Sequence, residues 1–196
     1  MTAPARVLSI TTHRVVTDDV ATEREWVLAA QAGDQAAFGW LVHRHQRRAY
    51  AVARGIVLNH EDAEDAVQDA FLHAFRALDR FRPDQAFGAW LHRIVANAAL
   101  DLTRRRKVRD ADELPETVSS PFRDPAESAD LRQRLREGLA ALPARQRAVI
   151  VLHDVEGYKH AEIGEMLGIP EGTARSDLHY ARARMRDALS SFTSED

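Results

Sequence analysis

The segment at residues 110–130 constrains the fold more than any other feature, because it divides the chain into two parts. It carries seven acidic residues against one arginine, together with Pro115, Pro121 and Pro125. Such a composition cannot bury enough apolar surface to hold a fold. We therefore expect a flexible acidic linker at 110–130, between a first domain at 23–109 and a second at 131–196. Residues 1–22 are predicted to be a mobile extension.

Composition limits the classes of protein that the chain can form. Its 196 residues, 45% hydrophobic and 29% charged, suffice for two small domains with modest cores. The absence of cysteine excludes disulfides and thiolate metal sites. No run of about 18 apolar residues occurs, and the N-terminus lacks the apolar core of a signal peptide. The sequence therefore predicts a soluble, cytoplasmic protein without direct membrane insertion.

Helical periodicity dominates outside the linker, and strand signals are almost absent. Gly33 before Asp34 predicts a helix end followed by a new N-cap, and Asn59 with Asp62 predicts the cap of the next helix. The sequence therefore predicts an all-α fold of two small helical domains. The residues expected to face the first core are Phe38, Leu41, Val42, Ala49, Val52, Ala53, Ile56, Val57, Ala63, Ala66, Val67, Ala70, Phe71, Ala74 and Leu78.

Acidic side chains line the outer face of the predicted helix after Asn59. Asp62, Asp65 and Asp69 recur at helical spacing, with Gln68 beside them. A solvated face that offsets the helix dipole explains this pattern without any function. Metal or acid–base chemistry would need a second ligand cluster or a nucleophile, and the sequence supplies neither.

A basic helix is predicted at 86–109. Five of the eight residues from Leu102 to Arg109 are basic and none is acidic, which exceeds what capping a helix end requires. Arg93, Asn97 and Arg104 share one face, and an asparagine side chain can both donate to and accept from a base edge. Trp90 keeps the apolar period, so we interpret it as a core residue rather than a DNA-stacking one. The inward set is Phe87, Trp90, Leu91, Ile94, Val95, Ala98 and Leu102.

The second half carries a helix-turn-helix pattern at 161–186. A short amphipathic helix ends at Gly168, Ile169 and Pro170 form the turn, and a second helix is expected to begin at Thr173. Its outer face is basic, as in a recognition helix that enters the major groove. A generic helical hairpin with a basic face would give the same pattern.

Specific motifs in both halves resemble a known family. Residues 62–71 (DAEDAVQDAF), 87–97 (FGAWLHRIVAN) and 101–106 (DLTRRR) resemble region 2 of the extracytoplasmic-function (ECF) sigma factors, in the sigma-70 family. Residues 142–147 (LPARQR) and 157–173 (GYKHAEIGEMLGIPEGT) resemble region 4 of the same family. The resemblance implies a transcription initiation subunit that binds core RNA polymerase and directs it to promoters, with no cofactor and no enzymatic activity of its own.

The resemblance also implies roles for individual residues. The acidic ridge would dock on the clamp helices of the polymerase β′ subunit, with the β subunit as a further contact. The loop at 81–85 would capture a base flipped out of the nontemplate strand. The implied polymerase-binding residues are Asp62, Asp65, Gln68 and Asp69; the minus-10 residues are Phe81, Arg82, Asp84, Arg93, Asn97, Asp101, Arg104 and Arg105; the minus-35 residues are Thr173, Arg175, Ser176, His179 and Arg182.

One position departs from the family pattern. Asp177 stands in the recognition helix where many relatives carry a basic residue. We expect it to weaken phosphate contact, to accept from a cytosine amino group, or to orient Arg175. Substitution of Asp177 is therefore expected to change promoter preference or binding strength. The resemblance further implies an anti-sigma protein that holds the factor inactive.

Two other classes of function compete with this interpretation. A stand-alone helix-turn-helix regulator would explain the second half but would leave the acidic ridge and the Asn97 face without a purpose. An enzyme would need histidines such as His43, His45, His153 or His160 as metal ligands or bases. His43 and His45 are two residues apart and cannot share a helix face, and no metalloprotease motif occurs.

Overall fold

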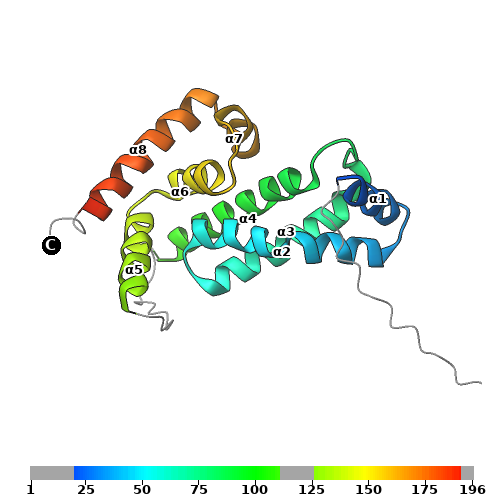
Figure 1. Ribbon diagram of the computed structural model, residues 1–196, viewed down its shortest axis with the longest axis horizontal. Helices are drawn as coiled ribbons and strands as arrows, with labels where there is room; N and C mark the ends of the chain where they lie inside the picture. The colour runs from blue at the N-terminus through cyan, green and yellow to red at the C-terminus, as the bar shows by residue number, and fades with distance from the viewer. Residues whose placement is uncertain (1–19, 111–125, 191–196) are drawn as a thin grey trace, which may run out of the picture.

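The computed structural model describes residues 20–110 and 126–190, in which the regular elements are all helical (Figure 1). The N-terminal half contains α1 (Val20–Gln31), α2 (Gln35–Val57), α3 (His60–Ala77), the 3-10 turn η1 (Leu78–Arg80) and α4 (Phe87–Asp110). The C-terminal half contains α5 (Ala126–Ala140), α6 (Ala144–Ile150), the π-helical turn η2 (Val151–Val155), α7 (His160–Leu167) and α8 (Glu171–Ser190). The all-α prediction is confirmed.

Helices extend further than the sequence patterns predict at three boundaries. α1 begins at Val20, before residue 23, and Val27, 1% exposed, anchors it in the core. α4 continues through Asp110, and α5 begins at Ala126, inside the segment expected to be irregular. α5 packs along α8, where Gly138 lets Met185 approach closely. The rest of the predicted linker, and residues 1–19 of the extension predicted at 1–22, lie outside the described residues.

The predicted caps set the ends of the N-terminal helices. Gly33 has φ of 98°, and the Asp34 carboxylate accepts from the backbone N–H of Ala36 at 2.8 Å. The Asn59 side chain likewise accepts from the Asp62 N–H at 2.7 Å. Both bonds satisfy donors that a helix N-terminus leaves unpaired. α2 ends at Val57, and the capping residue Leu58 that follows adopts a left-handed φ of 68°.

A stripe of alanines lets α3 pack closely against α2 and α4. Ala63, Ala66, Ala70 and Ala74 are fully buried, so the three helices meet with little side-chain volume between them. The larger core residues Leu41, Ile56, Phe87 and Leu91 come from α2 and α4. The first core therefore rests on α2 and α4, with α3 as a thin, tightly packed wall.

The helix-turn-helix is present as α7, a turn and α8. Gly168 ends α7 with a φ of 65°, and Ile169 donates to the Gly164 carbonyl at 2.9 Å. A Cβ at position 164 would lie 2.8 Å from the Ile169 carbonyl oxygen, so only glycine fits this turn. α8 begins at Glu171 rather than at Thr173, because Pro170 starts the turn and its carbonyl already accepts helical bonds.

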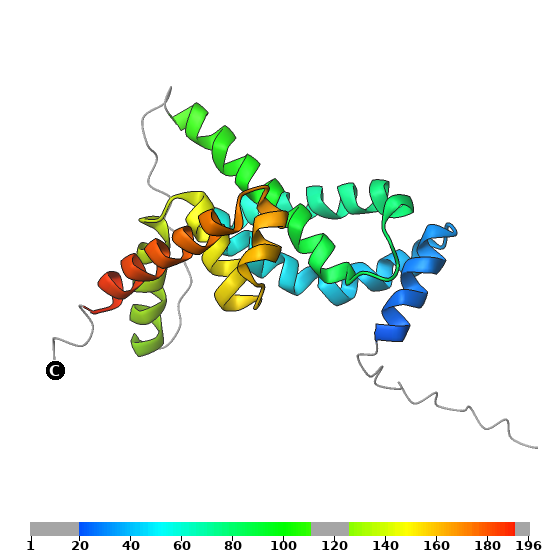
Figure 2. The ribbon, with the colours of Figure 1, turned by 90° about the horizontal axis from the view of Figure 1, so that it is seen from above.

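The two halves share one continuous core instead of standing apart. Figures 1 and 2 show α6 and α7 lying over α2 and α4, while the last turns of α4 extend away from the other helices. Arg147 of α6 is 8% exposed and donates to the Ile56 carbonyl of α2 at 2.7 Å. α4 therefore buries a second face: His92, Ala96 and Ala99, not expected to face a core, are covered together with Leu91 and Val95.

Candidate functional site

The acidic ridge on α3 is exposed at three of its four predicted positions. Asp65, Gln68 and Asp69 are open to solvent, whereas Asp62 is half-buried. The Asp62 carboxylate accepts from the Asn59 side chain and from Arg106 of α4, the latter at 2.9 Å. Asp62 thus ties α3 to α4, and its charge is largely matched within the molecule.

Apolar side chains continue the same face toward the end of α3. Leu72 is 46% exposed and Phe75 is 49% exposed, and the Phe75 ring packs edge-on against Phe38 with centroids 5.0 Å apart. Both lie one to three turns beyond Asp65 and Asp69. Neither residue was predicted to belong to a site. Their spacing from Asp65 nevertheless indicates that they lie on the same face of α3. Exposed apolar residues beside charged ones are typical of a protein-binding surface.

Four of the five predicted minus-10 residues of α4 line a groove of about 360 Å³ between α3 and α4. Asp101 and Arg104 pair at 2.8 Å, and both remain largely exposed. The groove is lined by Asp69, His73, Ala77, Trp90, Arg93, Ile94, Asn97, Ala98, Asp101, Leu102 and Arg105. The structure therefore brings Arg93, Asn97, Asp101 and Arg105 together on one wall. Arg104, which was predicted to share the face of Arg93 and Asn97, does not line the groove.

The loop between η1 and α4 separates into a buried residue and exposed ones. Phe81 is 5% exposed, and its ring lies 4.7 Å from Trp90 and 5.6 Å from Phe87. The prediction that Phe81 presents itself to a base is wrong for this structure, because the phenyl ring fills the core. Arg82 and Asp84 are exposed and pair at 3.0 Å.

Trp90 belongs to the core, as the apolar period predicts. Its ring is half-buried against Phe81 and Phe87, and its remaining edge lines the groove between α3 and α4. The loop above it is held by Gln31 of α1, whose side chain donates to the carbonyls of Leu78 and Phe81 at 2.7 and 2.8 Å.

The predicted minus-35 residues lie on the outer face of α8. Arg175, Ser176, His179 and Arg182 are exposed, and Thr173 is half-buried in the first turn. Arg175 pairs with Glu171 at 2.7 Å within the helix. Arg182 binds Asp154 of η2 through two nitrogens, at 2.5 and 3.0 Å, and this pairing lowers the pKa of Asp154. The paired guanidinium is thereby held in a fixed orientation on the surface.

Asp177 does not lie on the exposed side of α8 that carries the predicted minus-35 residues. It is 5% exposed and faces α6, where its carboxylate accepts from Arg145 at 2.6 Å. The predictions that it meets phosphate, accepts from cytosine or orients Arg175 are therefore wrong. The departure from the family pattern is an ion pair between two helices, which the helical spacing within α8 alone does not reveal.

The junction between the halves uses polar groups of the predicted DNA-reading helix. The Asn97 amide donates to the Arg93 carbonyl at 2.8 Å and to the Met166 carbonyl of α7 at 3.0 Å. His92 Nδ1 lies 2.9 Å from the Tyr158 hydroxyl and 3.7 Å from a Glu156 oxygen. Burial lowers the pKa of His92 to about 4 and raises the pKa of Tyr158 to about 12. A neutral imidazole therefore joins the two halves.

Metal binding and membrane insertion find no support in the two described ranges. Within residues 20–110 and 126–190, no three histidine, aspartate or glutamate side chains cluster in a way that could hold a metal ion. His43 is exposed, whereas His45 is nearly buried and pairs with Glu23 at 2.9 Å. None of the helices in these ranges has the length and apolar character needed to cross a membrane.

Comparison with known proteins gives matches over both halves. The family model Sigma-70 region 2 matches residues 41–109, and Sigma-70, region 4 matches residues 132–185. The ECF RNA polymerase sigma factor SigM of Mycobacterium tuberculosis is 40% identical over 168 residues, covering 86% of this chain and 85% of SigM. The ECF RNA polymerase sigma-E factor of Escherichia coli is 35% identical over 181 residues, covering 85% and 91% of the respective chains.

Two solved structures have a similar fold. CnrH, solved in complex with the cytosolic domain of CnrY, superposes with a TM-score of 0.65 at 33% identity, covering 87% of this chain and 98% of CnrH. The sigma factor RpoE of Bartonella quintana, solved with the anti-sigma factor NepR, gives a TM-score of 0.66 at 27% identity, covering 78% and 96%. From the family matches and the identities to the curated relatives, the chain belongs to the ECF sigma factors of the sigma-70 family.

Proposed function

We propose that the chain is an alternative sigma factor, which binds core RNA polymerase and directs it to promoters selected by sequence. The observation that supports this best is the presence on one chain of an exposed acidic ridge, a polar groove beside α4, and a recognition-type helix α8 with exposed arginines. A stand-alone regulator would need only the last of these. The chain would act as a subunit of the initiating enzyme and would carry no catalytic residue itself.

The acidic ridge is the proposed contact with the clamp helices of the polymerase β′ subunit. Asp65, Gln68 and Asp69 supply charge and hydrogen bonds at one end, and the exposed Leu72 and Phe75 add apolar area at the other. Polar groups around an apolar centre are the usual anatomy of a protein interface. Asp62 would contribute indirectly, by holding α3 against α4 through Arg106.

Charge reversal tests this contact. Asp65→Lys and Asp69→Lys are each expected to weaken binding to core polymerase at least 10-fold, because a cation then replaces the anion that complements the charge of the partner surface. Glu165→Lys is the charge-matched control, since Glu165 is an exposed acid of α7, away from the ridge on α3. Equal affinities for all three variants in a competition assay for core polymerase would remove the assignment.

The groove beside α4 is the proposed reader of the minus-10 element. Asn97 can make two hydrogen bonds to a base edge, and Arg93, Arg104 and Arg105 can hold phosphates while Asp101 orients Arg104. Arg82 and Asp84 lie at the exposed loop that would border a flipped base, which costs a few kcal/mol of lost stacking. Phe81 would support this loop from below rather than touch the base.

The outer face of α8 is the proposed reader of the minus-35 element. Arg175, Ser176 and His179 lie on the first turns, which enter the major groove in this motif, with Thr173 near a phosphate at the helix start. Arg182 stands one turn further, fixed by Asp154. Each good base contact contributes roughly 1–3 kcal/mol of discrimination.

Promoter binding would require the two halves to separate. The centres of the two promoter elements lie about 25 base pairs apart, which is about 85 Å along B-DNA. In the structure α7 contacts α4 directly, and Asn97 donates to the Met166 carbonyl. We infer that this compact arrangement is the free or inhibited state, and that polymerase holds the halves apart. An anti-sigma protein, of the kind that NepR is for RpoE in the solved complex, would stabilise the compact state.

Transcription from a genomic promoter library by purified core polymerase, with and without the protein, tests the function directly. We expect new start sites that share motifs near minus-10 and minus-35, and we expect Asn97→Ala to abolish selection at one minus-10 position. Binding to DNA without binding to core polymerase, and without new starts, would instead favour the stand-alone regulator.

A further inference from the structure

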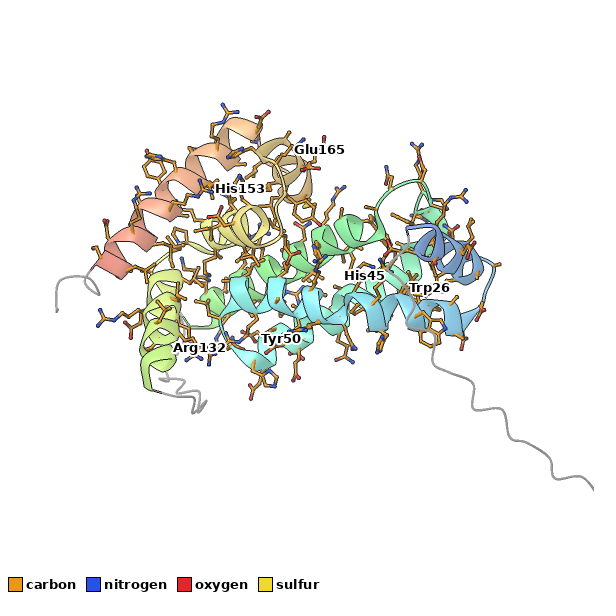
Figure 3. All side chains as sticks on the ribbon, in the orientation of Figure 1. Trp26, His45, Tyr50, Arg132, His153 and Glu165 are labelled. Atoms are coloured by element: carbon orange, nitrogen blue, oxygen red, sulfur yellow. The ribbon has the colours of Figure 1, made fainter. Side chains whose placement is uncertain are left out.

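The turn η2, which follows α6, is π-helical and touches the recognition helix α8. Its Glu156 N–H donates to the Val151 carbonyl at 3.2 Å, a bond that spans five residues instead of four. Val151 and Leu152 are buried, whereas Asp154 lies at the surface. His153, labelled in Figure 3, lies beside α8. Single π-helical turns of this kind are frequent at functional sites.

Asp154 holds the Arg182 guanidinium along one edge. One carboxylate oxygen accepts from Nη2 at 2.5 Å and the other accepts from Nε at 3.0 Å. His153 Nδ1 lies 2.7 Å from the same carboxylate, and the hydrogen bonds from Arg182 and His153 lower the pKa of Asp154. Among the described residues, Arg182 Nη1 makes no hydrogen bond. The planar group is therefore fixed through one edge, and its outer edge keeps N–H donors for a ligand.

Neither stability nor charge attraction explains this ion pair. The two side chains are 47% and 31% exposed, and ion pairs at the surface contribute little to the free energy of unfolding. A carboxylate on a DNA-binding face repels phosphate and cancels the charge of a cation that would otherwise attract it. The presence of Asp154 beside Arg182 is therefore unfavourable for DNA affinity, unless the orientation of the guanidinium matters more than its charge.

Arg175, on the same face of α8, is held in a different way. It pairs with Glu171 of its own helix through one nitrogen, and the two side chains are 68% and 50% exposed. Both partners are long side chains of one helix, so neither fixes the other against a second element. Arg182 is instead bound through two nitrogens by a residue of η2, outside α8. Its orientation is therefore set by how η2 packs against α8.

Arg182 borders a hollow of about 290 Å³ on the outer face of α8. The hollow is lined by His160, Arg175, Leu178, His179, Arg182 and Arg186. No acid is among these residues, and Asp154 does not line the hollow although it binds Arg182. The hollow thus presents donors, and a guanidinium fork matches a ligand with two adjacent acceptors. In DNA such acceptors are O6 and N7 of a guanine, or two oxygens of one phosphate.

We propose that Asp154 is a positioning residue for minus-35 recognition, which orients Arg182 so that the outer edge of its guanidinium donates to two adjacent acceptors of the DNA. The proposal has an unusual sign. Removal of an acidic side chain beside the DNA-binding face should weaken DNA binding, although it removes a repulsive charge. The inference rests on the proposed function, because it names the residue that orients one arginine of the proposed minus-35 reader.

The test measures binding of holoenzyme, assembled from core polymerase and the full chain, to a promoter that the wild-type protein selects. Asp154→Ala and Arg182→Ala are each expected to weaken binding by roughly 5- to 150-fold, the range for loss of one good bidentate contact. The double variant should bind no more weakly than Arg182→Ala, because Asp154 acts through Arg182 alone. Glu165→Ala, which removes an exposed acid of α7 labelled in Figure 3, is the control and should not weaken binding.

Promoters with single base-pair changes across the minus-35 element identify the acceptors. If Arg182 reads a guanine, Asp154→Ala and Arg182→Ala should lose discrimination at the same single position. If it holds a phosphate, both variants should lose affinity evenly across all the sequences. A merely structural role of Asp154 would give neither this shared profile nor the non-additive double variant.

Three results would overturn the inference. They are unchanged promoter binding by Asp154→Ala, tighter binding by Asp154→Ala, and losses that add in the double variant. Tighter binding would show that the carboxylate only repels phosphate, and additive losses would show that Asp154 acts apart from Arg182. Failure of the wild-type protein to direct initiation by core polymerase would instead reject the proposed function.

Discussion

Gly55 of α2 offers a way to open the compact arrangement without changing any residue that we propose to bind DNA or polymerase. A Cβ built at this position would lie 2.7 Å from Cγ2 of Val151, which belongs to η2 in the opposite half. Val151 is 5% exposed and its β-branched side chain has little rotameric freedom. Gly55→Ala therefore cannot be accommodated in the compact arrangement unless the two halves shift.

The size of the effect follows from two opposing contributions. Alanine stabilises a helix interior by roughly 0.5–1 kcal/mol relative to glycine, and it does so in both arrangements. The clash, which exists only when the halves are packed, costs about 1–3 kcal/mol, as overpacking does in other cores. The population ratio of separated to packed molecules is therefore expected to rise about 5- to 150-fold.

A distance measurement between the halves reads this ratio directly. The chain contains no cysteine, so labels on cysteines introduced at the exposed Gln46 and Glu165 report only the α2–α7 separation. Gly39→Ala is the matched control, because a Cβ at this α2 position meets nothing within 4 Å. The reasoning is refuted if Gly55→Ala and Gly39→Ala give the same distance distribution. Gly55→Ala combined with Val151→Ala should restore the packed state.

Three further outcomes are expected. Because the pKa of His92 is lowered to about 4 in the folded chain, only the unfolded chain takes up a proton at this histidine as the pH falls through 6.5. The free energy of unfolding should therefore drop by about 3 kcal/mol by pH 4. Urea unfolding should show that His92→Gln lacks this loss and that the control variant His73→Gln retains it. Arg147→Met should lower the free energy of unfolding, measured in urea, by roughly 2–3 kcal/mol, because the carbonyls of Ile56 and Leu142 lose their hydrogen-bond donor. Asp177→Ala should lower the melting temperature through loss of the Arg145 pair while leaving minus-35 preference unchanged.

Local features of the fold could be predicted from the sequence because their causes lie within a few residues. The caps at Asp34 and Asn59 each depend on a side chain and on an N–H two or three positions away. The turn before α8 depends on Gly168, whose φ of 65° few other residues tolerate. The exposed positions of Asp65 and Asn97 follow from helical period alone.

The errors arise where a residue's partner lies outside its own helix or turn. Asp177 meets Arg145 of α6, and Phe81 meets Trp90, so in both cases the contact depends on how helices pack. His92 has the helical position of a polar face of α4, and the C-terminal half covers that face. Helical period identifies one buried stripe per helix, and α4 has two.

The bond between Asn97 and the Met166 carbonyl has a thermodynamic consequence for regulation. Under the proposed function, one amide group would serve either α7 or a base, so the two states would compete for the same donor. By linkage, packing of α7 lowers the affinity for minus-10 DNA by some factor. Bound minus-10 DNA must then lower the equilibrium constant for α7 packing by the same factor. Because the acceptor on α7 is a backbone carbonyl, no substitution of the Met166 side chain removes it. The competition therefore depends on the position of α7, and a variant that abolishes it must shift α7 away from Asn97.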